Sequence, residues 1–219
     1  MEEHVIEFNQ LAMTHAQGSD VMLNRVMTKD NIALAVLLET QNDSWLTGNV
    51  REPVKLLVST AHIHWDPEFC DVKLIQTMML LDQIRRLVEQ KSPERIQLLL
   101  CGDFNSLPDS GVIEYIQQGK IRVDHPDFRK LAYKKSLCKM ISHSPDEEMY
   151  NHKFQLDSAI DPTIMPFTNY TYDFKGMIDY IFYARKTMKP LGFLGPVDPE
   201  WLKENKVIGC PHPHMASGN

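Results

Sequence analysis

A short apolar run that stops at a glycine constrains this chain more than any other stretch. Leu98–Cys101 is continuously apolar, and Gly102 ends the run. Asp103 follows at once, and Asn105 comes two residues later. Such a run predicts a buried strand whose chain turns at the glycine. Because ligands of α/β proteins bind outside the carboxyl ends of strands, this carboxylate and amide are candidate site residues. Both residue types also favour turns, so a purely structural role stays open at this point.

Two further segments predict strands beside this one. Asn31–Thr40 is rich in Ile, Val and Leu and is bounded by polar residues, which predicts a buried strand. Val54–Trp65 predicts a second strand, in which a period of two places His62 and His64 on the same face. Two histidines on one face raise the odds of phosphate or metal contacts, although a histidine near a strand end is often only structural.

Helical periodicity predicts a long helix after the second strand. Asp66 suits an N-cap and Pro67 the first turn, and the helix runs to about Gln90. Its apolar positions recur at helical spacing: Leu74, Ile75, Met78, Leu81, Ile84 and Val88. The chain then returns as the strand Ile96–Cys101. Strand, helix and strand at these lengths predict an α/β layer.

The other elements are predicted to be shorter. A helix is expected from Pro108 through Tyr115, ended by Gly119, and helical turns are expected near Phe128–Met140. The start of the chain, around Val5–Phe8, fits either a strand or a short amphipathic helix.

Irregular segments and a short strand complete the pattern. Ser44–Pro53 and Ser142–Tyr150 are predicted loops, and the glycine- and proline-rich tail is mostly loop. Thr168–Phe174 is a possible short strand, after which Lys175-Gly176 turns the chain. The tail sequence Cys210-Pro-His-Pro-His214 has zinc-ligand residue types without the usual spacing, so an extended loop is the favoured interpretation.

Size and charge bound the functional class. A chain of 219 residues with 43% apolar and 24% charged residues is typical of one globular domain, or a large piece of one. The net charge of −6 is a poor basis for holding nucleic acid by surface charge alone. It suits an enzyme whose carboxylates surround a divalent cation. No apolar run is long enough to cross a bilayer, so no membrane association is expected.

Cysteine usage bears on location. The four cysteines lie far apart without a C-x-x-C pair, and no export signal opens the sequence. We therefore expect reduced thiols and a cytoplasmic protein, with the nucleus as an additional location.

A third strand carries another candidate site residue. Met177–Tyr183 is predicted as a strand, with Asp179 flanked by apolar neighbours. A carboxylate inside such a strand is costly to bury unless it is paired, hydrogen-bonded or bound to a metal. Buried carboxylates of this kind are more often functional than not.

Several motifs together carry a family resemblance. Gly102-Asp-Phe-Asn-Ser106, Thr60-Ala-His-Ile63 and Ile178-Asp-Tyr-Ile-Phe182 resemble motifs of the endonuclease/exonuclease/phosphatase superfamily. Within it, the chain resembles the carbon catabolite repressor four-type deadenylases over nearly its whole length. The supporting stretches are His64-Trp-Asp-Pro67, Leu107-Pro-Asp-Ser-Gly111, Thr168-Asn-Tyr-Thr-Tyr-Asp-Phe-Lys-Gly176 and Gly209-Cys-Pro-His-Pro-His214.

The resemblance implies Mg²⁺-dependent, 3′-to-5′ removal of poly(A) tails from mRNA with release of AMP. By motif match, Asp103 positions the attacking water and neighbours the metal, with an indirect contact or one made through water. Asn105 holds the scissile phosphate and stabilises its developing charge. Asp179 orients a catalytic histidine, and His62 contacts phosphate.

The resemblance also implies substrate contacts and partners. Pro67 and Phe174 match residues that flank the terminal adenine, where an aromatic face suits base stacking. His64 is a further substrate-binding candidate. In the family, other subunits of the CCR-four–NOT complex bind through leucine-rich repeats, which this sequence does not contain.

Two family motifs are not found in this sequence. One is a metal-binding glutamate in an N-terminal strand, and the other is a C-terminal Ser-Asp-His, where this chain reads Ser217-Gly-Asn219. We therefore expect residues 1–219 to form a partial nuclease domain, an α/β two-sheet sandwich lacking its N-terminal portion, with little or no activity alone. Two alternatives remain: a non-catalytic fragment that binds RNA or partner proteins, and another Mg²⁺-dependent phosphodiesterase or phosphatase of the superfamily.

Overall fold

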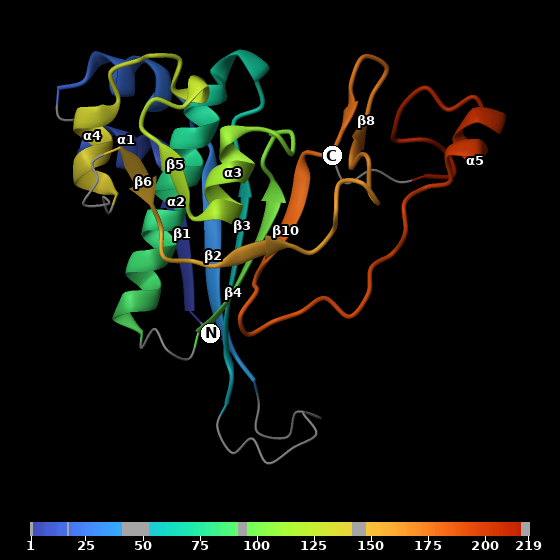
Figure 1. The fold of residues 1–219 in the computed structure, drawn as a ribbon, viewed down its shortest axis with the longest axis horizontal. Helices are drawn as coiled ribbons and strands as arrows, with labels where there is room; N and C mark the ends of the chain where they lie inside the picture. The colour runs from blue at the N-terminus through green and yellow to red at the C-terminus, as the bar shows by residue number, and fades with distance from the viewer. Residues whose placement is uncertain (1, 17, 41–52, 92–95, 142–147, 216–219) are drawn as a thin grey trace.

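A six-stranded mixed sheet forms the centre of the computed structural model, which describes residues 2–16, 18–40, 53–91, 96–141 and 148–215 (Figure 1). The strand order is β1-β2-β3-β4-β10-β7. The bounds are β1 Glu2–Glu7, β2 Ile32–Glu39, β3 Lys55–His62, β4 Ile96–Asp103, β7 Leu156–Ser158 and β10 Asp179–Ala184. Only the β3–β4 pair is parallel in this sheet, and the other neighbouring pairs are antiparallel.

Helices and two small sheets surround this centre. The α-helices are α1 Phe8–His15, α2 Cys70–Gln90, α3 Gly111–Gln118, α4 Lys134–Met140 and α5 Pro199–Glu204. Single turns of other helix types are Met22–Val26, Pro67–Phe69 and Pro126–Phe128. The two-stranded sheets pair β5 Lys120–Arg122 with β6 Met149–Asn151, and β8 Asn169–Tyr170 with β9 Lys175–Gly176. In Figure 1, α5 stands apart from the other helices, beyond β8. None of the helices in the described ranges is both long and apolar enough to cross a bilayer.

Helix α2 is the main element packed against the sheet. The predicted apolar positions from Leu74 to Ile84 are all buried. The predicted cap residue caps the turn before this helix: the Asp66 carboxylate accepts the Glu68 backbone N–H at 2.9 Å in Pro67–Phe69, whereas the N-cap of α2 itself is Phe69. Asp71, fully buried in the first turn, takes two hydrogen bonds from Arg25, at 2.7 and 2.8 Å. This pairing allows a charged residue on a helix that is buried almost all round.

The face of the sheet opposite α2 carries exposed apolar side chains. Along β3, alternate residues Leu57, Ser59 and Ala61 are buried. The intervening positions belong to rows of residues in register, such as Leu34–Thr60–Cys101–Ile181. On this face Ile32 is 54%, Leu34 38% and Ile181 46% exposed. The predicted α/β class is confirmed, and the described residues supply one large sheet whose second face carries no second large sheet.

Most predicted elements are present, with corrections at their ends. The strand 31–40 and the helix ended by Gly119, here a left-handed C-cap after α3, are confirmed. The open start of the chain contains both structures, since strand β1 leads directly into α1. The predicted loop 44–53 falls on undescribed residues up to 52. In the predicted loop 142–150, residues 142–147 lie outside the described part, and β6 begins at Met149.

The hairpin near residue 170 also differs from the prediction. Lys175 and Gly176 were expected to turn the chain but form β9, which pairs with β8. The turn lies earlier, because the Thr171 hydroxyl contacts Asp173 at 3.0 Å and accepts the Phe174 N–H at 3.1 Å. Local side-chain hydrogen bonds of this kind favour turns.

Candidate active site

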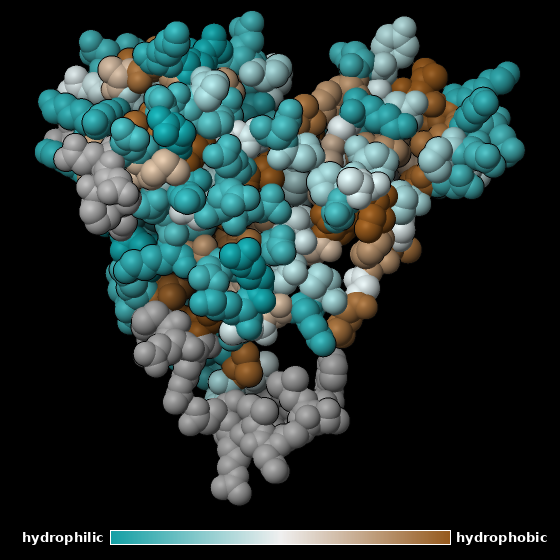
Figure 2. Space-filling view, in the orientation of Figure 1, coloured by the Kyte–Doolittle hydropathy of each residue, from teal (hydrophilic) through white to brown (hydrophobic). Residues whose placement is uncertain are grey.

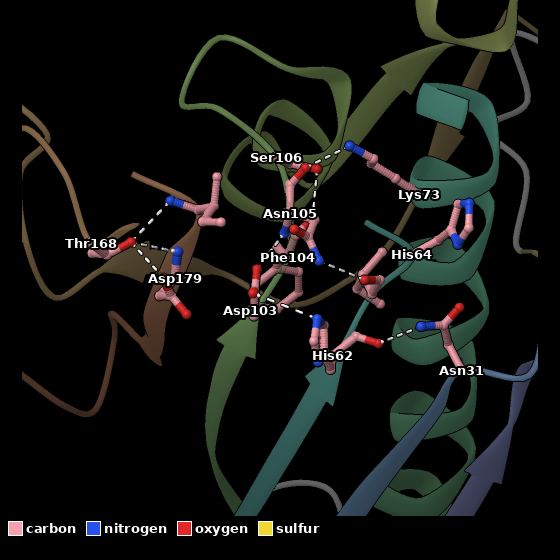
Figure 3. Close-up of polar contacts among 12 residues, drawn as sticks. Asn31, His62, His64, Lys73, Asp103, Phe104, Asn105, Ser106, Thr168 and Asp179 are labelled. Carbon is pink, nitrogen blue, oxygen red and sulfur yellow. Dashed lines mark hydrogen bonds and ion pairs between the residues drawn. The ribbon is translucent and has the colours of Figure 1, made fainter. Parts of the chain in front are cut away.

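Three of the predicted site residues lie in one row across the end of the sheet. His62 is the register partner of Asp103 on β3 and β4, and Asp103 is the register partner of Asp179 on β4 and β10. Figure 3 shows the His62 ring pointing toward Asp103. Strand pairing therefore brings together side chains that are 41 and 76 residues apart in the sequence.

Gly102 makes this row possible. Its φ is +145°, and a Cβ placed there would lie 2.0 Å from the Ala61 carbonyl oxygen. Such a φ is almost confined to glycine, and the close approach of β3 leaves no room for a side chain. The sequence predicts that the chain turns at Gly102, but β4 continues through this residue, and both Gly102 and Asp103 pair with β3 and β10. The glycine is required for a steric reason and not for a turn.

The Asp103 carboxylate is a partly buried acceptor. One oxygen accepts the Asn105 backbone N–H at 2.8 Å, and the other lies 3.6 Å from His62 Nε2. Burial raises the pKa of Asp103 above its usual value. The negative charge of Asp179 also raises the pKa, whereas the hydrogen bond from the Asn105 N–H and the nearby His62 lower it. Asp103 is therefore a carboxylate whose affinity for a proton is increased by its surroundings.

Asn105 is fixed in an uncommon backbone conformation. Its φ is +46°, which asparagine adopts more readily than most residues. Its side-chain Nδ2 donates to the Ile63 backbone carbonyl at 2.9 Å, and the backbone carbonyl of Asn105 accepts a hydrogen bond from Lys73 Nζ at 2.7 Å. An amide NH₂ has two hydrogens, so the Ile63 bond occupies only one of them. Figure 3 shows these contacts converging on the loop after β4.

Asp179 differs from the sequence prediction in its burial. It is the first residue of β10 and is partly exposed, because the strand begins at Asp179 and not at Met177. Its Oδ2 accepts the Thr168 hydroxyl at 2.6 Å, and Thr168 Oγ1 in turn accepts the backbone N–H groups of Ile178 and Asp179. Thr168 orients this carboxylate. Sequence reasoning missed it, since nothing in a lone threonine before a short strand signals such a contact.

A cavity of about 650 Å³ lies at the loop after β4. Its lining includes Pro67 and Phe174, the predicted base-flanking residues, together with Asn105. Trp65 and Asn169 also line it. The Phe174 side chain is 38% exposed, so its ring has free surface. The structure thus brings Pro67, Asn105 and Phe174 together, while His62, Asp103 and Asp179 line a second cavity on the open face of the sheet.

His64 is not part of this arrangement. Strand β3 ends at His62, so the alternation that would have placed both histidines on one face stops before His64. The His64 ring is 8% exposed, packs edge-on against Phe69 at 5.2 Å between centroids, and its backbone N–H donates to Gln76. Burial lowers the pKa of His64. Its side chain faces away from Asp103 in Figure 3, which corrects the predicted geometry of the pair.

The side chains that the structure describes do not by themselves form a complete metal centre. Within the described ranges, no three His, Cys, Asp or Glu side chains converge closely enough to hold an ion. Mg²⁺ requires near-octahedral oxygen coordination and is commonly held by one or two carboxylates, water and substrate phosphate. Asp103 offers a single carboxylate, one oxygen of which is already hydrogen-bonded. The donor set therefore fits at most a partial Mg²⁺ site.

Sequence comparison identifies relatives over almost the entire chain. It is 50% identical to CCR4-NOT transcription complex subunit 6-like of Danio rerio over 234 residues, covering 99% of this chain and 42% of the relative. The chain is also 36% identical to the CCR4-Not complex 3′-5′-exoribonuclease subunit Ccr4 of Mycosarcoma maydis, and this match covers 99% of this chain and 33% of that relative. No protein-family model matches it.

The solved structures agree at the level of the fold. The structure of ANGEL2, a 2′,3′-cyclic phosphatase in complex with adenosine-2′,3′-vanadate, superimposes with a TM-score of 0.60 at 22% identity. The match covers 84% of this chain and 55% of the ANGEL2 chain. This likeness supports the predicted α/β fold. The chain spans less than half the length of the curated relatives it matches.

Proposed function

We propose that this chain carries the 3′-end binding region and part of the catalytic machinery of a poly(A)-directed 3′-5′ exoribonuclease. The observation that carries the proposal is that Asn105, which lines the cavity with Pro67 and Phe174, donates its backbone N–H to Asp103 in the row at the end of the sheet. The relatives named as 3′-5′-exoribonuclease subunits support the same reaction class. The proposed product is AMP.

The cavity suits a terminal nucleotide. An adenine stacks on the exposed Phe174 ring, with Pro67 on another part of the wall. The phosphate that follows lies toward Asn105, whose second Nδ2 hydrogen donates to a phosphate oxygen. Stacking is tolerant of base identity, so selection of adenine requires polar groups at the base edge. Asn169 is the amide on the cavity wall that is suited to that contact.

The row residues divide the remaining tasks. Asp103, with its raised pKa, accepts a proton from the attacking water or holds that water in line with the phosphate. His62 lies at the exposed end of β3 and contacts phosphate oxygens. Asp179 is oriented by Thr168, and its second oxygen would orient the catalytic histidine that the family resemblance implies. A bound Mg²⁺ would supply Lewis-acid stabilisation of the phosphoryl oxygens, and Asp103 is the residue that would contribute to holding it.

Binding to short homopolymers tests the proposal. We expect the chain to bind 3′-hydroxyl oligo(A) more tightly than oligo(C) or oligo(U) of equal length, measured by fluorescence anisotropy at fixed salt. An oligo(A) with a 3′-phosphate should bind more weakly, because the added charge meets the carboxylate row. Equal affinity for all three bases would contradict the proposal.

A non-catalytic role is the second candidate, and the incomplete donor set favours it. In this alternative the chain binds RNA or partner proteins without cleaving RNA, and the exposed apolar face of the sheet is where a protein would pack. Incubation with Mg²⁺ and 5′-labelled oligo(A) separates the two. AMP release that Asp103→Ala abolishes supports the nuclease, whereas intact oligo(A) that stays bound supports the binding role.

Partners and location extend the proposal. We propose that the protein assembles with CCR4-NOT subunits, since its relatives are named as subunits of that complex. We also propose that it works in the cytoplasm, with the nucleus as a second location. Co-purification of tagged protein from fractionated cells tests both points.

A further inference from the structure

A buried lysine outside the predicted site contacts its central residue. Lys73 lies in the first turns of α2 and is 7% exposed. Its Nζ donates to the Asn105 carbonyl oxygen at 2.7 Å, and its side chain lines the same cavity as Pro67 and Phe174. Figure 3 shows the side chain reaching from α2 to the loop after β4.

Burying an ammonium group is costly unless a specific interaction offsets the loss of water. Asp66, Asp103 and Asp127 provide negative charge around Lys73, and burial still lowers its pKa. A neutral side chain of similar length would fill the same space without that cost. The ammonium is therefore explained better by its hydrogen bond to the Asn105 carbonyl than by packing of the side chain.

The contact links two walls of the cavity. Pro67 stands in the turn that leads into α2, and Asn105 stands at the end of β4. Lys73 joins these elements through the carbonyl of a residue whose φ is +46°. A charge-assisted hydrogen bond to that carbonyl stabilises the left-handed conformation, which in turn sets the direction of the Asn105 side chain.

We propose that Lys73 is a positioning residue: its ammonium fixes the backbone of Asn105 and thereby the amide that meets the substrate phosphate. The inference rests on the proposed function, because it assigns Lys73 a part in 3′-end binding. Lys73 acts through Asn105 and does not itself contact the reacting atoms.

AMP affinity in variants of the full chain tests the proposal by isothermal titration calorimetry. We expect Lys73→Ala to weaken AMP binding about tenfold or more, the range for loss of a hydrogen bond to a charged group. Lys134→Ala, which removes an exposed charge on α4, is the matched control and should leave affinity unchanged. Equal affinity of Lys73→Ala and the original chain would overturn the proposal.

Chemical rescue separates positioning from packing. n-Propylammonium replaces the atoms that Lys73→Ala removes and should restore affinity, whereas tetramethylammonium has the charge but no N–H group and should not. Equal rescue by both cations, or by neither, would overturn the assignment. If Lys73→Ala does not fold by circular dichroism, Lys73→Met, which keeps most of the apolar stem and removes the ammonium, takes its place in the affinity comparison.

A second measurement keeps this inference separate from the proposed function. If the original chain binds no AMP, the proposed function fails, and NMR spectra of the free protein then decide the role of Lys73. Lys73→Met should shift the amide resonances of Asn105 and Ser106 while leaving those of α4 in place. Unchanged Asn105 and Ser106 resonances would refute positioning whatever the binding result.

Discussion

Gly102→Ala should disrupt the sheet at the point where the site is built. The new Cβ would lie 2.0 Å from the Ala61 oxygen and 2.9 Å from the Ala61 nitrogen, closer than real Cβ atoms approach backbone. The φ of +145° adds a conformational cost of about 1–3 kcal/mol. Overpacking adds about 1–3 kcal/mol, and separation of β3 from β4 weakens ladder hydrogen bonds worth about 1 kcal/mol each. With one such bond lost, the sum predicts destabilisation by about 3–7 kcal/mol.

Urea denaturation followed by circular dichroism measures this change. With a slope of about 3 kcal/mol/M, the unfolding midpoint should fall by about 1–2 M. Two other glycines provide matched controls. Gly18 has a φ of +74° and open space, so Gly18→Ala reports the conformational cost alone, about 1 kcal/mol. Gly192 has neither constraint, so Gly192→Ala should change stability by less than about 0.5 kcal/mol. A Gly102→Ala midpoint equal to that of Gly18→Ala would refute the steric argument.

Three further predictions concern the site. Phe174→Ala should weaken oligo(A) binding by about 1–3 kcal/mol in anisotropy titrations. The control is Tyr172→Ala, two residues away, which removes a more exposed ring that does not line the cavity and should leave binding unchanged. Equal losses from the two substitutions would argue against stacking on Phe174. Asp103→Asn should raise the free energy of unfolding at pH 7, and this gain should disappear in acid. The reason is that the pKa of Asp103 is higher in the folded than in the unfolded chain, so that ionisation of Asp103 destabilises the fold as pH rises. A difference in urea midpoint that does not change with pH would contradict the raised pKa. Mg²⁺ titrated into the RNA-free chain should bind only weakly, in the millimolar range, because few ligands converge; micromolar affinity by calorimetry would show that the donor set is more complete than the geometry indicates.

The positions of Asp103 and Asp179 along the chain were predictable because each stands at the end of an apolar run that forms a strand. Asp103 ends β4 and Asp179 begins β10, and the apolar runs beside them mark both strands. That the two residues are direct neighbours depends on register, which local sequence does not specify. The family resemblance supplied their roles, and the structure supplied the row.

Errors and omissions share a physical cause. His64 was assigned to the face of His62 because alternation was extended two residues beyond the end of β3. Thr168 and Lys73 were missed because their functions depend on contacts with residues 11 and 32 positions away. Periodicity describes a residue within its own element, so contacts between elements escape it.

The row at the end of the sheet has fixed dimensions. His62, Asp103 and Asp179 sit on adjacent strands, so the spacing of their backbones follows the hydrogen-bond ladder, about 4.8 Å from one strand to the next. Substitution of a side chain in the row changes its charge or reach but leaves the distance between attachment points unaltered. Proteins that share this sheet could therefore differ widely in chemistry while keeping one span, about 10 Å, for the groups that act on a substrate.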